Sequence, residues 1–182
     1  LRRAGYNSFD LSKEKGSRIE SRSITQHEAM GRPVTYLGRY AEKYRAEGDS
    51  TLTNGLRGDW GYLEGRWQGF IDSTGMDVVV DMGKVTEIRN VEVDFMHQYD
   101  AVIYAPASVE LMVSDDGKNY KTIDTAQPGV KTKEAYLVYP YRWKGNAKGR
   151  YVRVRALSRE KDAWIFTDEV IVNRIIRSCR KG

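Results

Sequence analysis

Cysteine, histidine, proline and long apolar runs are all scarce in this sequence. Its 182 residues include one cysteine, two histidines and four prolines. The lone Cys179 excludes an internal disulfide framework and a cysteine-based zinc site. No apolar run approaches the roughly 20 residues of a membrane-spanning helix. The sequence begins at Leu1 without a signal-peptide segment, so we expect it to be a piece of a longer protein.

Basic residues are outnumbered by acidic residues in the middle of the chain. The net charge of +5 divides into +5 for residues 1–45, −8 for 46–141 and +8 for 142–182. A nucleic-acid-binding protein usually concentrates basic residues on one face. The loops that look functional lie in the acidic block, so we expect no nucleic-acid partner.

Helical periodicity is absent, whereas strand periodicity is common. Residues 91–95, 109–113 and 151–157 alternate between apolar and polar side chains, which is typical of half-buried strands. The Asp116-Gly117 pair between two such stretches indicates a hairpin, because glycine tolerates a positive φ. Several short strands separated by turns predict an all-β fold, an antiparallel β-sandwich from about Val34 to Asn173.

The chain divides into three parts by composition. Residues 1–32 are polar and without a clear period, and we expect an N-terminal arm or the tail of a preceding domain. Residues 33–175 form the main domain, in which Val34, Tyr36 and Leu37 belong to a first strand. Residues 176–182 form a basic C-terminal tail.

Residues 52–70 (LTNGLRGDWGYLEGRWQGF) combine glycines and aromatic residues with oxygen ligands. The Asn54 carboxamide, the carbonyls of Thr51 and Leu56 and the Asp59 carboxylate can converge if the chain turns at Gly55. Hard oxygen ligands from one loop suit calcium. Such a loop needs a further carboxylate, for which Glu169 is a candidate. The alternative is that Asn54-Gly55 is simply a turn.

The aromatic residues of this stretch, with two near position 165, have two possible roles. Rigid rings offer contact area for sugars at low entropic cost, and nearby arginines or Gln68 can donate hydrogen bonds. The other possibility is core packing, which we expect for Trp67. The residues concerned are Trp60, Tyr62, Trp67, Phe70, Trp164 and Phe166, with Arg57 and Arg66 as donors.

Five stretches in this order resemble discoidin domains, the type C domains of coagulation factors V and VIII and the family 32 carbohydrate-binding modules. They are GDSTLTNGLRG…GRWQGF, DVVVDMGKVTEIRNVEVDF, PASVELMVSDDGKNY, RYVRVRAL and WIFTDEVIV. The lead-in GRPVTYLGRYAEKYRAEGDSTLTNG is most similar to the C-terminal domain of chitobiases, the β-N-acetylhexosaminidases of gut Bacteroidetes. The resemblance spans about residues 33–173.

The resemblance implies an eight-stranded jelly-roll sandwich of the galactose-binding type with a structural calcium ion beneath its binding loops. Asn54 stands where the family has a calcium-binding aspartate, and Asp59 where it has a serine or threonine. One carboxylate is lost and one gained, so with Glu169 the ligands keep a charge of −2. The implied ligands are Thr51, Asn54, Leu56, Asp59 and Glu169, with Asp168 as a further carbonyl.

The resemblance also implies a glycan partner. Trp67 matches a core tryptophan of the family, so contact with a terminal galactose, N-acetylgalactosamine or N-acetylglucosamine falls on loop residues. These are Trp60, Tyr62, Arg66, Tyr99, Tyr104 and Trp164. A secreted, periplasmic or cell-surface location follows from the same resemblance.

Catalytic residues are not apparent. A glycosidase needs two carboxyl groups across the scissile bond. Asp115 and Asp116 fall in an exposed turn, and the adjacent Asp168 and Glu169 point to opposite faces of a strand. Neither histidine, His27 or His97, has a matched nucleophile. We therefore expect no catalysis by this piece, and hydrolase activity in another domain of the parent protein.

Two alternatives to glycan binding remain. The piece can be a structural module whose aromatic residues pack against a neighbouring domain. It can also bind membrane lipid, as the coagulation domains do, although Asp59 and Glu64 beside the loop aromatics disfavour an anionic surface.

Overall fold

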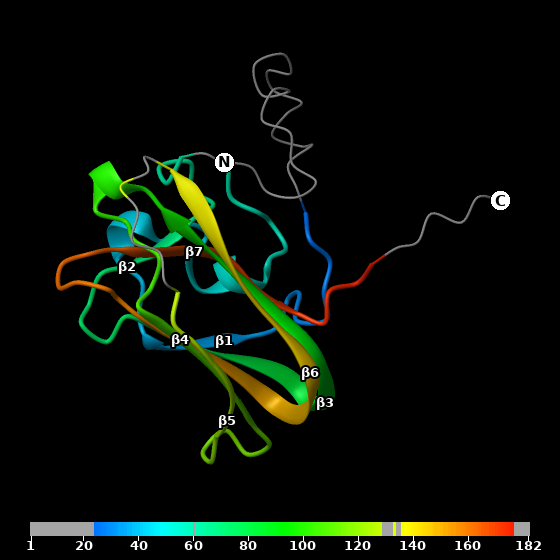
Figure 1. The fold of residues 1–182 in the computed structure, drawn as a ribbon. Helices are drawn as coiled ribbons and strands as arrows, with labels where there is room; N and C mark the ends of the chain where they lie inside the picture. The colour runs from blue at the N-terminus through cyan, green and yellow to red at the C-terminus, as the bar shows by residue number, and fades with distance from the viewer. Residues whose placement is uncertain (1–23, 60, 129–132, 134–135, 177–182) are drawn as a thin grey trace.

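The computed structural model describes residues 24–59, 61–128, 133 and 136–176. This part of the chain contains seven strands, three short 3₁₀ helices and no α-helix, which confirms the predicted all-β fold (Figure 1). The resemblance implies eight strands; the described residues form seven, of which β3 and β6 each exceed 20 residues. The strands are β1 (Val34–Gly38), β2 (Gln68–Phe70), β3 (Met76–His97), β4 (Ser108–Ser114), β5 (Lys121–Ala126), β6 (Leu137–Leu157) and β7 (Ile165–Val172), and the 3₁₀ helices are η2 (Glu42–Tyr44), η3 (Gly48–Thr53) and η4 (Tyr99–Ala101).

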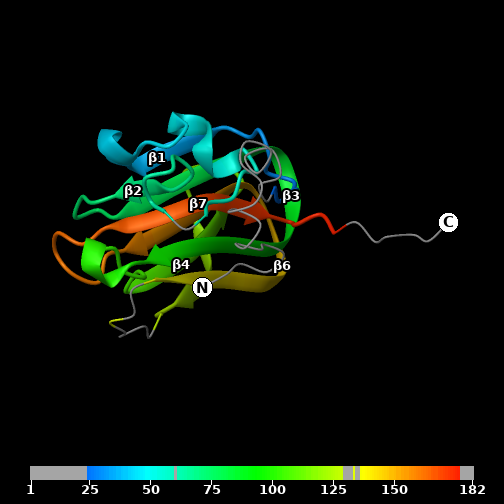
Figure 2. The ribbon, with the colours of Figure 1, turned by 90° about the horizontal axis from the view of Figure 1, so that it is seen from above.

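The long strands β3 and β6 organise the sandwich. The strands are ordered β2-β7-β3-β6-β4-β5, and β1 pairs with the first part of β3. Every pairing between these strands is antiparallel, and β3 runs beside β6 with register breaks between Asp81 and Thr86 and between Ile88 and Asn90. Figure 2 shows residues 34–55 along one side of the molecule, β4 and β6 along the other, and β7 between them.

The alternating stretches place apolar side chains in the core as predicted. Val78 and Val80 of β3, and Val152 and Val154 of β6, are fully buried. Most of the buried apolar side chains belong to this main core. A second, smaller core of Trp67, Met96, Ile103 and Phe166 lies at the beginning of β7.

Residues 24–32 pack directly on the sandwich. The Thr25 N–H donates to the Gly55 carbonyl, and the Glu28 N–H donates to the Val172 carbonyl, at 2.9 and 2.8 Å. Thr25 and His27 are buried. These contacts attach the segment before β1 to the loop after η3 and to the end of β7.

The predicted hairpin turn and the predicted first strand are both present in the structure. Asp116 and Gly117 lie in the β4–β5 hairpin, where Gly117 has a φ of 75°. The predicted first strand is β1, which turns Val34 and Tyr36 toward the core and leaves Leu37 53% exposed. None of the helical segments in the described ranges has the length and hydropathy needed to cross a membrane.

Candidate functional site

Two of the predicted ligand-contact residues, Tyr62 and Trp164, meet in one aromatic cluster at the beginning of β7. We define the aromatic cluster as Tyr44, Tyr62, Trp164 and Phe166. Tyr44 contacts Trp164 at a ring-centroid distance of 5.0 Å and Tyr62 at 5.7 Å. Phe166 is fully buried beneath them, whereas the other three rings are partly exposed. The cluster therefore has a buried base and a surface that solvent reaches.

The segment after η4 brings two more predicted residues to Trp164. The Trp164 N–H donates to the Val102 carbonyl at 2.8 Å, and the Tyr104 N–H donates to the Trp164 carbonyl at 3.1 Å. Tyr99 lies beside Tyr104, with ring centroids 5.8 Å apart. Because backbone hydrogen bonds fix this segment, four of the six predicted contact residues gather at one end of the sandwich.

The two remaining predicted contact residues, Trp60 and Arg66, are not among these four. Trp60 lies outside the described residues. Arg66 is partly exposed, and its Nη1 is buried without a hydrogen-bond partner in the described ranges. A buried guanidinium nitrogen with no acceptor is costly.

Arg57 is not a ligand contact, which corrects its proposed role as a donor to sugar. Its guanidinium is 4% exposed and lies between two buried carboxylates. Nη2 donates to Asp94 at 2.8 Å, Nε donates to Asp168 at 3.0 Å, and Nη1 donates to the Thr25 hydroxyl at 2.8 Å. All three nitrogens are therefore used within the protein.

Trp67 is a core residue, as predicted, and it holds the glycine-rich loop in place. Its ring is 1% exposed, and its Nε1–H donates to the Asp59 carbonyl at 2.8 Å. The Tyr136 hydroxyl donates to the same carbonyl at 2.8 Å. A Cβ added at Gly58 would lie 2.3 Å from the Trp67 ring. The glycine is required because the backbone passes directly over the indole.

Glu169 is the centre of the predicted cation site. Its carboxylate is fully buried, and Oε2 accepts hydrogen bonds from the Gly55 N–H at 2.7 Å and from His27 Nε2 at 2.6 Å. His27 Nδ1 accepts from the N–H groups of Ala29 and Val172, so the ring proton is on Nε2. Oε1 of Glu169 is buried without a hydrogen-bond partner in the described part of the chain.

The electrostatics of this pair follow from burial. Burial, reinforced by the neighbouring Asp168, raises the pKa of Glu169 to about 10. Burial, reinforced by Arg57, lowers the pKa of His27 to about 4. The imidazole is therefore neutral, and the Glu169 carboxyl group holds a proton at neutral pH unless a cation takes its place. The bare Oε1 suits a proton or a metal cation, and in this respect the site fits calcium.

The other predicted calcium ligands surround Glu169 less completely. Asn54 Oδ1 accepts from the Leu56 N–H at 2.9 Å, and the Thr51 carbonyl accepts from the Asn54 N–H at 3.3 Å. Asp59 is buried, and Gly55 places the turn of this loop against Glu169. No group of three or more His, Cys, Asp or Glu side chains in the described ranges is arranged to hold a metal. Calcium would therefore need backbone carbonyls in addition to Glu169.

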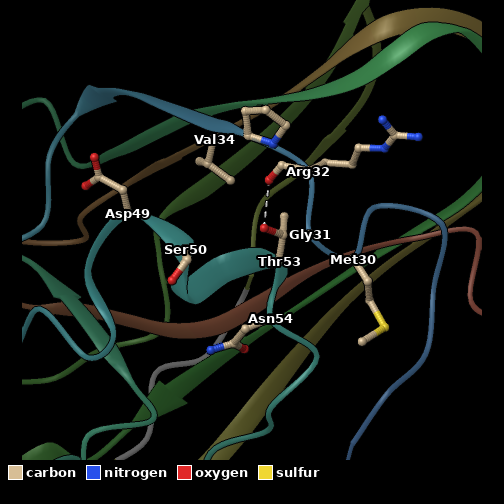
Figure 3. Close-up of a pocket in the computed structure, with 9 residues that line it drawn as sticks. Met30, Gly31, Arg32, Val34, Asp49, Ser50, Thr53 and Asn54 are labelled. Carbon is tan, nitrogen blue, oxygen red and sulfur yellow. Dashed lines mark hydrogen bonds between the residues drawn. The ribbon is translucent and has the colours of Figure 1, made fainter.

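Asn54 also lines a pocket of about 520 Å³ between η3 and residues 30–34 (Figure 3). The Thr53 hydroxyl donates to the Arg32 carbonyl at 2.8 Å and joins the two walls. The Asn54 side chain thus belongs to the surface of the loop as well as to the turn that contacts Glu169.

Sequence reasoning missed two residues of these sites. Tyr44 joins Tyr62 to Trp164, and its only signal was its place in the YAEKY stretch before η3. His27 was considered as a possible catalytic residue without a matched nucleophile, and the polar segment around it gave no period that would place it in the core.

The arrangement of strands defines a discoidin-type, galactose-binding-like β-sandwich. Residues 35–170 match the F5/8 type C domain model, and since this range covers most of the chain, the chain belongs to that family. None of the curated proteins compared matches the chain significantly.

Several solved structures share the fold at low identity. The fucolectin from striped bass (Morone saxatilis) serum has a TM-score of 0.57 and 16% identity, over 82% of this chain and 49% of that chain. Chitosan-binding module 1 of a Paenibacillus sp. IK-5 chitosanase/glucanase has a TM-score of 0.55 and 16% identity, over 81% and 98%. SpGH29 has a TM-score of 0.53 and 13% identity; the match covers 84% of this chain and spans 28% of SpGH29.

Proposed function

We propose that this chain is a non-catalytic glycan-binding module that binds a terminal hexose or N-acetylhexosamine at the aromatic cluster. The observation that carries the proposal is that Tyr62 and Trp164 both pack on Tyr44 and the buried Phe166, with Tyr104 beside Trp164. Partly exposed rings over a fixed base offer a stacking surface at little entropic cost. Arg66 supplies a donor for a ring hydroxyl or an acetamide carbonyl.

Similar proteins support this proposal. The Paenibacillus module is named for chitosan binding and the striped bass protein as a fucolectin. Both share the fold of this chain. We propose further that the module belongs to a secreted, periplasmic or cell-surface glycoside hydrolase, a β-N-acetylhexosaminidase of the chitobiase type, and holds that enzyme near its substrate.

Calcium is part of the proposal as a structural ion. Glu169 Oε1 would bind it directly, with the Asn54 carboxamide, the Asp59 carboxylate and the carbonyls of Thr51 and Leu56 as the remaining ligands. A bound dication would neutralise the buried carboxylate and hold the loop after η3 against β7.

The experiment is a titration of the protein with galactose, N-acetylgalactosamine and N-acetylglucosamine, followed by NMR. A shallow site with one or two rings corresponds to millimolar binding, about −4 kcal/mol. Trp164→Ala should weaken binding about tenfold with the fold intact. Trp143→Ala, at a partly buried tryptophan of β6 that packs on the main core, is the matched control and should not change affinity. Unshifted resonances at tens of millimolar of every sugar would refute glycan binding at this site.

A structural module is the second candidate, favoured by the burial of Tyr62 and Trp164 against Tyr44 and Phe166. On this reading the cluster packs against a neighbouring domain of the parent protein. A chain that binds none of the sugars but is stabilised by that domain, and loses the stabilisation in Trp164→Ala, would establish it.

A further inference from the structure

A groove crosses the outer face of the sheet away from the aromatic cluster. Its volume is about 470 Å³, within the usual range for small-molecule sites. One wall is the segment of Pro33, Thr35 and Leu37 in and before β1, and the other is the β4–β5 turn, residues 116–118, with Tyr120. Val79 of β3 and Arg153 of β6 are between them.

The groove is separate from the proposed glycan site. Along β4 and β6, Ser108 pairs with Leu157 near the Trp164 end, whereas Ser114 pairs with Tyr151 in the groove. Six residue steps along a strand amount to about 20 Å. One small sugar cannot contact both places.

Ion pairs fix the lining and balance its charge. Arg153 donates to both carboxylate oxygens of Asp77 at 2.8 and 2.7 Å, and Arg150 donates to both oxygens of Asp81 at 2.8 and 3.0 Å. The Arg153 guanidinium also lies 5.3 Å from the Tyr120 ring centroid. Bidentate pairs of this kind are geometrically specific, so these side chains are held in place before a ligand arrives.

Several hydrogen-bonding groups of the lining are not used by the protein. The hydroxyls of Thr35, Tyr120 and Tyr151 and the Lys118 ammonium group have no hydrogen-bond or ion-pair partner among the residues that the structure describes. Leu37, 53% exposed, lies on the β1 wall with Thr35. The groove thus offers hydrogen-bonding groups on both walls and apolar surface on the β1 wall.

We propose that this groove is a second glycan site, which binds a short, uncharged oligosaccharide across the sheet. The inference goes beyond the proposed function, because it concerns a different surface. A neutral ligand fits because the arginines are paired with aspartates, leaving Lys118 beside Asp116. A peptide fits less well, because the β3 and β6 backbone groups beneath the groove are paired within the sheet on both sides, so a crossing ligand must be recognised by side chains.

The test is an NMR titration with two neutral trisaccharides, triacetylchitotriose and cellotriose. Resonances of Gly117, Tyr120 and Tyr151 should shift in the wild type and equally in Trp164→Ala. Tyr120→Ala and Lys118→Ala should each weaken this binding at least tenfold. Lys84→Ala, a lysine outside the groove, is the matched control and should leave it unchanged.

The outcomes separate the two sites. Shifts at Tyr62 and Trp164 alone would overturn the groove proposal and leave the first site standing. Shifts in the groove alone would support the second site and remove the first. Unchanged binding in Tyr120→Ala, or groove shifts that disappear in Trp164→Ala, would also overturn it.

Discussion

The imidazole of His27 donates a hydrogen bond of 2.6 Å to the buried carboxylate of Glu169, which lies 142 residues later in the chain. His27 lies outside residues 35–170, the part that matches the family model. The contact therefore makes residues 24–32 part of the folded domain rather than an appendage to it.

Removing this imidazole should destabilise the domain. His27→Ala takes one of the two donors from Glu169 Oε2 and leaves the N–H groups of Ala29 and Val172 without their acceptor. A buried polar group without its partner costs about 1–3 kcal/mol. Urea unfolding measures the loss, and Gln26→Ala, at an exposed neighbour, should change little. Equal stability of both variants and the wild type would show that His27 is dispensable.

Arg57→Ala should be more damaging. The substitution leaves Asp94 and Asp168 buried without the guanidinium between them, and breaking such a buried pair costs about 3–5 kcal/mol. Arg39→Ala is the matched control, because the Arg39–Asp49 pair is more than half exposed on both sides and water screens such a pair, so that it adds little to stability. Thermal or urea unfolding that ranks Arg39→Ala as the more damaging change would contradict the network described here.

The strands could be predicted because apolar alternation depends on local sequence, whereas the ion network could not. Val93 and Phe95 were placed in the core and are buried, but the same alternation places Asp94 in solvent. Asp94 is buried because Arg57, from a loop 37 residues earlier, covers it. Asp168 and Glu169 are both fully buried, since β7 is covered on each face. Pairing between distant segments leaves no periodic signal in the sequence.

The aromatic cluster was predicted in part for a related reason. Tyr62 and Trp164 were chosen because they lie in loops outside the alternating stretches, and the structure brings them together. Tyr44 was missed because a single tyrosine in a polar stretch gives no indication of which loop it faces.

The contact between Gly58 and Trp67 predicts a strong difference between two glycines of one loop. Gly58→Ala forces a Cβ into the indole ring, and overpacking of this kind costs about 1–3 kcal/mol. Gly61→Ala should be tolerated, since its nearest neighbour would be the Leu63 nitrogen at 4.0 Å. Differential scanning calorimetry of the two variants compares them directly. Similar melting temperatures would mean that the indole can move aside.

Calcium should stabilise the folded chain through Glu169. An ion that binds only the native state adds RT ln(1 + [L]/Kd), about 2.7 kcal/mol at a hundredfold excess over Kd. The melting temperature should therefore rise with calcium and fall back with chelator. Glu169→Gln should remove this response, because an amide keeps the size of the side chain but lacks the charge that binds the ion. Glu47→Gln, at an exposed glutamate before the same loop, should respond as the wild type does. If wild-type melting curves in saturating calcium and in chelator coincide, and the protein carries no metal, then Oε1 is satisfied by a proton and the proposed ion site is absent.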